Sequence, residues 1–247
     1  MTKTLATAAL LALIAGPALA GFEIQEANTE ENAVTLESVN TVFFGDLEDQ
    51  IRSSHELTVG WGVVHGYAFE FGFELENPSA DDESADFSGL ELTNTIALIG
   101  EEGFSTSDTF ALALIAGLEF EFEESSDVSL TLGPAIEAEL GGVELLSNTF
   151  LEIPLGGGEG LGFSYALGGY YEMTDDVAIG LEAHGEIEEV FDDTPALSEQ
   201  EHFIGPAVAF EIGLEEDQEV GMRVGTFFGL TDETPTVGLS LNLELEF

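Results

Sequence analysis

The chain has 247 residues, of which 50 are Asp or Glu and only 3 are Lys or Arg, so its formal net charge is −47 at pH 7. This charge excludes nucleic-acid binding through phosphate contacts, which need Lys and Arg, and the lack of Cys excludes disulfides and Cys-ligated metal sites. High net charge is typical of disorder, but 44% hydrophobic residues indicate a folded chain whose acidic and apolar side chains occupy separate surfaces.

The first 20 residues have the pattern of an export signal. Lys3 gives a positive start, residues 5–14 form an apolar run, and Ala18 to Ala20 provide a small-residue cleavage motif. The run is too short to span a bilayer as a helix. A buried N-terminal helix is the alternative, but the cleavage motif favours a signal peptide over residues 1–20.

Residues 67–76 show the pattern of a β-strand most clearly. Aromatic or leucine side chains occupy every odd position from Tyr67 to Leu75, and Glu or small residues occupy the even positions. A period of two is typical of a strand with one apolar and one polar face. The same alternation recurs over 110–123, 177–188 and 237–247, and no long stretch shows helical periodicity.

Turn-forming residues divide the rest of the chain into twelve expected strands. Most exceed the 5–6 residues of ordinary strands and match the about 9–11 residues of a tilted membrane-spanning strand. The even count, and short connections that alternate approximately with long ones, are typical of an outer-membrane barrel. We therefore predict an all-β fold, a transmembrane antiparallel up-and-down β-barrel over residues 33–247, preceded by a periplasmic segment over 21–32. The expected strands cover 33–44 (where the alternation is least regular), 54–62, 67–77, 89–99, 109–122, 128–140, 143–153, 161–173, 177–188, 201–213, 220–230 and 236–247.

The sequence also indicates which face of the strands points into the barrel. Eight strands already suffice to fill an interior with side chains, so an apolar interior does not suit twelve. The polar face carries small residues between its acids, as at Gly162 and Ser164, which suits a water-filled lumen. Aromatic side chains gather near expected strand ends, as in the girdles of membrane barrels. The apolar face is therefore expected to contact lipid. The candidate girdle residues are Phe43, Phe44, Trp61, Tyr67, Tyr170, Tyr171, Phe227 and Phe228.

The last strand ends with an aromatic residue after apolar residues at every second position. Leu243, Leu245 and Phe247 resemble the C-terminal strand of outer-membrane proteins that the barrel-assembly machinery recognises. We therefore expect this machinery and outer-membrane lipid as partners, and a monomeric barrel.

Four further segments, residues 55–61, 67–76, 200–206 and 227–235, carry a family resemblance. From about residue 54 to the end, the chain resembles a family of uncharacterised Gram-negative outer-membrane barrels that are often labelled as candidate transporters. This family is related to the meta-pathway phenol-degradation-like barrels. The resemblance implies an outer-membrane barrel without an established substrate. Relatives usually carry basic residues where this chain has acids, so an anionic ligand is not expected.

Inward carboxylates define the candidate lumen. On the expected topology they form one ring near each mouth, and such rings concentrate cations and repel anions. Arg223 is the sole base expected in the lumen, and we expect it either to pair with Glu182 or Glu211 at a constriction or merely to relieve repulsion. The candidate lumen residues are Glu70, Glu182, His184, Glu211 and Arg223. The external ring is expected to hold Glu56, Glu74, Glu76, Glu91, Glu119, Glu121, Glu123, Glu152, Glu186, Glu188 and Glu201, and the periplasmic ring Glu137, Glu139, Glu144, Glu172, Glu211, Glu219, Glu244 and Glu246.

No catalytic or metal centre is predicted. His184 lies between Glu182 and Glu186 and could coordinate a divalent ion, but an isolated His among carboxylates is more often solvated. Nothing in the sequence singles out a serine near His184 or His202 as nucleophilic catalysis requires, so neither enzyme activity nor a cofactor is expected.

The leading functional prediction is a passive pore or small-solute transporter that favours small cationic or neutral solutes. One alternative is a non-conducting structural or surface barrel. Another is a secreted, soluble acidic barrel that binds a ligand in an apolar interior. The acidity also fits a saline habitat, where screening is strong.

Overall fold

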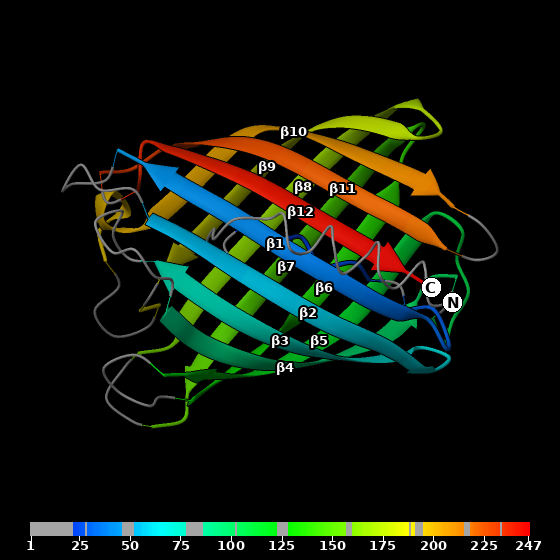
Figure 1. Cartoon of the computed structure of the whole chain (residues 1–247), viewed down its shortest axis with the longest axis horizontal. Helices are drawn as coiled ribbons and strands as arrows, with labels where there is room; N and C mark the ends of the chain where they lie inside the picture. The colour runs from blue at the N-terminus through cyan, green and yellow to red at the C-terminus, as the bar shows by residue number, and fades with distance from the viewer. Residues whose placement is uncertain are drawn as a thin grey trace.

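Twelve antiparallel strands form a closed barrel in the computed structural model of the chain (Figure 1). Each strand pairs with its neighbours in sequence, and β1 closes the barrel against β12. The model describes residues 22–27, 29–45, 52–77, 86–101, 103–122, 128–156, 160–187, 189–190, 195–214, 218–232 and 234–247. The predicted signal peptide, residues 1–20, lies outside these residues.

The predicted fold class and strand count are confirmed, and every strand end lies within three residues of its expected position. A short 3-10 turn, Leu197–Glu199, precedes β10. Within the described residues, no helix is long and apolar enough to cross a membrane. The strands are β1 (Val34–Phe44), β2 (Arg52–Val64), β3 (Tyr67–Asn77), β4 (Asp86–Ile99), β5 (Phe110–Glu121), β6 (Val128–Glu139), β7 (Val143–Pro154), β8 (Gly162–Thr174), β9 (Val177–Ile187), β10 (Glu201–Gly213), β11 (Glu219–Gly229) and β12 (Val237–Glu246).

The two ends of the barrel differ in how the strands are joined. At one end, which we call the turn end, residues 65–66, 141–142 and 175–176 join strands by tight turns, and β1 begins beside the last residue, Phe247. At the opposite end, which we call the loop end, the connections are mostly longer. This arrangement has the alternation expected of a barrel inserted from one side of a membrane.

The outer face of the barrel is apolar around almost its whole circumference. Each strand from β2 to β12 exposes at least one large apolar side chain on this face, which would be unfavourable in water over so large an area. The alternative of a soluble barrel with an apolar interior therefore does not fit, because the apolar side chains point outward and carboxylates line the inside. One exposed example per strand is Leu57, Phe73, Ile96, Leu114, Leu132, Leu151, Leu167, Leu181, Ile212, Val224 and Leu239.

Three of the predicted girdle residues are not on the outer face. Phe43, Tyr170 and Phe227 point into the barrel, where the side chain of Phe227 is 1% exposed. Trp61 and Phe228 do face outward and are half-exposed, as a girdle requires. The prediction was wrong for the first three because nearness to a strand end does not reveal the face, whereas position parity does.

β1 departs from the apolar pattern. Its outward positions include Ser38 and Asn40, and the Asn40 amide donates hydrogen bonds of 3.0 Å to Ser38 Oγ and to the backbone oxygen of Leu241 on β12. The amide is thereby partly satisfied within the wall. Closure between β1 and β12 depends mainly on ten consecutive backbone pairs rather than on this outer face.

Candidate functional site

The chain before β1 lies inside the barrel. We call the described residues 22–27 and 29–33 the luminal segment; its side chains Phe22, Ile24 and Ala27 are almost fully buried by the surrounding wall. Residues 21–32 were predicted to form an N-terminal periplasmic segment, whereas the described residues of this range lie within the barrel. The reason is that the wall offers hydrogen-bond partners for the backbone of this segment, which a strand pattern does not reveal.

Asn148 on β7 holds the middle of the luminal segment. Its Oδ1 accepts a hydrogen bond of 2.7 Å from the Gln25 backbone N–H, and its Nδ2 donates one of 2.9 Å to the Gln25 backbone oxygen. Two residues further along the segment, the Ala27 N–H donates a hydrogen bond to the carboxylate of Glu137 on β6. These side chains thus replace, for three backbone groups of the segment, the pairing that a neighbouring strand would give.

Phe22 anchors the other end of the segment in an aromatic cluster. Its ring centroid lies 5.4 Å from that of Phe43, 4.9 Å from Phe203, 4.2 Å from Phe227 and 5.0 Å from His184. The rings come from β1, β9, β10 and β11, so Phe22 connects strands on one side of the lumen. Most of these contacts have the edge-on geometry that aromatic pairs prefer.

Beside this cluster, Glu182 is the centre of a buried polar network. Its carboxylate lies 2.7 Å from His184 Nε2 and 3.6 Å from Arg223 Nε, and it accepts a hydrogen bond from the Tyr170 hydroxyl. Arg223 in turn donates from Nη2 to the Phe22 backbone oxygen at 3.2 Å. The expected pairing of Arg223 with Glu182 is therefore present, and the guanidinium also holds the luminal segment.

Asn242 on β12 completes the anchor. Its Nδ2 donates a hydrogen bond of 3.1 Å to the same Phe22 oxygen. Ser240 lies two residues earlier on the inward face. Its hydroxyl group donates a hydrogen bond of 2.9 Å to Asn242 Oδ1 and fixes the orientation of the amide. The Phe22 carbonyl is thus held by two donors from adjacent strands.

Gly62 allows the segment to pass close to β2 where it turns into β1. A Cβ atom at this position would lie 1.7 Å from the backbone oxygen of Glu30, so any other residue would push the segment away. The Asn32 backbone N–H donates a hydrogen bond of 2.7 Å to the Gly62 backbone oxygen. Asn32 itself has a φ of 69°, a left-handed conformation that Asn tolerates better than most residues.

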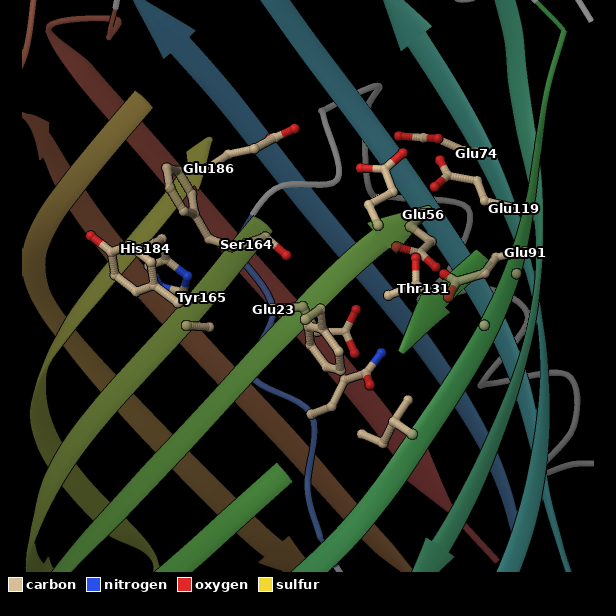
Figure 2. Close-up of a pocket in the computed structure, with 18 of the residues that line it drawn as sticks. Glu23, Glu56, Glu74, Glu91, Glu119, Thr131, Ser164, Tyr165, His184 and Glu186 are labelled. Atoms are coloured by element: carbon tan, nitrogen blue, oxygen red, sulfur yellow. The ribbon is translucent and has the colours of Figure 1, made fainter. Parts of the chain in front are cut away.

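The luminal segment lies between two cavities, both of which Glu23 and Gln25 line. The cavity toward the loop end has a volume of about 500 Å³, and that toward the turn end about 400 Å³. Figure 2 shows the first of them, with Glu23 in the lumen, Glu56 and Glu91 on one wall, and His184 on another. The loop-end cavity is lined by Glu56, Glu74, Glu91, Glu119, Glu121, Glu152, Glu186 and Glu201, and the turn-end cavity by Glu70, Glu144, Glu211, Glu219, Glu244 and Glu246.

These cavities hold most of the two predicted carboxylate rings, although Glu123 and Glu188 lie outside the described residues. On the luminal segment, burial raises the pKa of Glu23 to about 8, and repulsion from Glu91 and Glu70 adds to the shift. This shift favours the protonated form of the Glu23 carboxyl group at neutral pH. This limits the repulsion between the segment and the acidic wall.

The structure brings together only three of the five predicted lumen residues. Glu182, His184 and Arg223 form one network, whereas Glu70 and Glu211 line the turn-end cavity apart from it. The prediction missed the residues that hold the luminal segment. Their signal was an amide or an aromatic ring at an inward position, in a lumen otherwise lined by acids and small residues. The missed residues are Phe22, Gln25, Asn148, Tyr170, Phe203 and Asn242, whereas Glu137 was expected in the periplasmic ring.

Comparisons with known proteins agree on the fold. Searches against protein-family models and curated proteins give no match for this sequence. Among solved structures, the outer membrane channel from Pseudomonas putida F1 is 11% identical with a TM-score of 0.59, covering 90% of this chain and 97% of that chain. The NanC porin is 8% identical with a TM-score of 0.55, covering 86% and 98%. The beta domain of the Bordetella autotransporter BrkA is 10% identical with a TM-score of 0.53, covering 88% and 99%.

The chain therefore has the fold of outer-membrane β-barrels. Identities this low establish the fold alone, and the similar structures include a channel, a porin and an autotransporter domain. The choice among functions must come from the lumen of this chain.

Proposed function

We propose that the protein is an outer-membrane pore for small cationic or neutral solutes, closed in this conformation by its luminal segment. In this proposal the apolar outer face contacts outer-membrane lipid, and the chain reaches the membrane through a cleaved signal peptide and the barrel-assembly machinery. Leu243, Leu245 and Phe247 would provide the assembly signal, and the barrel would act as a monomer.

The observation that carries the proposal is the acidity of both cavities. Carboxylates line each of them, whereas Arg223 is the one Lys or Arg that lines either cavity among the described residues. Its charge is paired with Glu182, so it offers little attraction to a passing anion. A mouth with rings of one sign raises the local concentration of ions of the opposite sign.

Bilayer recording across a salt gradient tests the ionic preference. We expect brief openings whose reversal potential corresponds to cation permeation. Glu56→Gln combined with Glu91→Gln should lower the cation-to-anion permeability ratio by about twofold, because both carboxylates line the loop-end cavity. Glu101→Gln combined with Asp108→Asn, which removes two exposed acids of the connection between β4 and β5 at the turn end, is the charge-matched control and should leave the ratio unchanged. Anion selectivity of the unmodified protein would contradict the proposal.

The luminal segment itself favours a second candidate, a structural or surface barrel that conducts nothing. Hydrogen bonds to β2, β6, β7, β11 and β12 hold the segment across the lumen. If neither the full chain nor a chain without the segment passes current, this second candidate replaces the pore.

A further inference from the structure

Three carboxylates converge on one wall of the loop-end cavity. Glu119 and Glu121 on β5 and Glu152 on β7 each place one oxygen within 4.8 Å of the others. All three line the same cavity. Like charges repel at this separation, and nothing in the network described around Glu182 involves these residues.

The strand between them, β6, carries only short hydroxyl side chains at this level. Ser129 lies directly opposite Glu119, and Thr131 lies opposite Glu152. Thr131 lines the cavity, and Ser129, two residues earlier, faces the same side because strand side chains alternate. These short side chains leave room for the carboxylates of β5 and β7 to approach each other across β6.

Ser129 provides an independent indication of a ligand. Its side chain is buried, with 7% of the residue exposed, and its Oγ has no hydrogen-bond partner among the described residues. Buried hydroxyl groups are nearly always paired. Ser129 and Glu119 are directly opposite each other on the same luminal face, where paired residues lie about 4.5–5.5 Å apart at Cβ, so the unpaired hydroxyl group belongs to the wall of the carboxylate cluster.

We infer that Glu119, Glu121, Glu152 and Ser129 form a binding site for a hard divalent cation, best suited to calcium. All the donors are oxygens, which excludes the nitrogen and sulfur sets that zinc prefers. Calcium takes oxygen ligands at about 2.3–2.6 Å, so two ligands on one ion can lie about 5 Å apart, whereas the smaller shell of magnesium allows about 4.2 Å. The separation of these carboxylate oxygens fits within the calcium shell.

The charge of the chain supports a cation at this place. After residue 20 the sequence holds two basic residues, Arg52 on β2 and Arg223 on β11, and neither strand adjoins β5, β6 or β7. A bound calcium ion would supply the positive charge that no side chain of β5, β6 or β7 provides. It would also bridge β5 to β7 at the mouth. This inference does not depend on conduction through the barrel.

Equilibrium binding of radioactive calcium to the full chain in detergent micelles, at a fixed background of sodium chloride, tests the site. We expect one saturable site per chain. Glu119→Gln with Glu152→Gln should weaken binding by at least about tenfold, since carboxylate number sets calcium affinity. Ser129→Ala should weaken it several-fold although it changes no charge.

Glu186→Gln with Glu201→Gln is the matched control, because it removes the same charge from the same cavity. It should alter the affinity far less, since β9 and β10 are at least two strands away from the cluster on β5 and β7 and charges are screened over a Debye length of about 10 Å at 0.1 M salt. Three results would each show diffuse accumulation of cations and overturn the inference. They are equal weakening by both double variants, unchanged binding in Ser129→Ala, and binding that does not saturate. If the Glu119 and Glu152 double variant does not fold, Ser129→Ala against wild type decides alone.

Discussion

Deletion of residues 22–32 should convert the barrel from a mostly closed to a permanently open state. These residues supply the ring of Phe22 and the backbone groups that Asn148, Arg223 and Asn242 hold across the lumen. In planar bilayers, the open fraction should rise from the roughly 0.1–10% typical of a minor conformation to nearly the whole recording.

The wall should tolerate this deletion. β1 keeps ten backbone pairs with each of β12 and β2, and the donors that lose the segment become accessible to water in the lumen. Circular dichroism should therefore still report a folded barrel. A folded variant whose current resembles that of the full chain would show that the segment does not close the pore.

The second large effect is expected at Arg223. Replacing it by Ala leaves the buried carboxylate of Glu182 without its base, which is expected to cost about 3–5 kcal/mol. The Phe22 oxygen also loses one of its two donors, so the open fraction should rise. Urea unfolding of the folded protein in micelles measures the first effect, and bilayer recording measures the second.

A second substitution separates these two effects. Glu182→Gln added to Arg223→Ala removes the unpaired charge and should restore most of the lost free energy of unfolding, but not the closure. Arg52→Ala removes the same charge from the loop end, where the guanidinium lies 5.8 Å from the Phe43 ring centroid, and should cost only about 0.5–2 kcal/mol. A double variant that is as unstable as Arg223→Ala alone would show that Arg223 does not act through Glu182.

The alternation of side chains was enough to predict the barrel. A strand that separates water from lipid must alternate in polarity, and β3, β9 and β12 do so almost without exception. β1 was less regular because Ser38 and Asn40 occupy outward positions. Its place is instead set by backbone pairing with β12 and β2, which depends little on side-chain polarity.

The lumen was only partly predictable. A sole base among carboxylates must find a partner, so the pairing of Arg223 with Glu182 could be expected. The luminal segment could not, because the wall binds its backbone at Phe22, Gln25 and Ala27, and backbone groups are the same in every sequence. The available signal for a bound segment was the odd or even position of aromatic residues along the strand. Phe227 is an aromatic residue at an inward position, with glycines at the inward positions on either side of it.

A reversible tether between the segment and the wall tests the central claim most directly. The chain has no Cys, so Gln25→Cys with Asn148→Cys introduces the sole thiols, at two residues whose hydrogen bonds bring them close enough for a disulfide to be expected. Bilayer recording should show no openings in the oxidised protein. After reduction, openings should be at least as frequent as in the wild type, because Asn148→Cys also removes the two hydrogen bonds to Gln25. Asn148→Cys alone should not respond to oxidation. Equal currents before and after reduction of a confirmed disulfide would contradict closure of the pore by its own N-terminal segment.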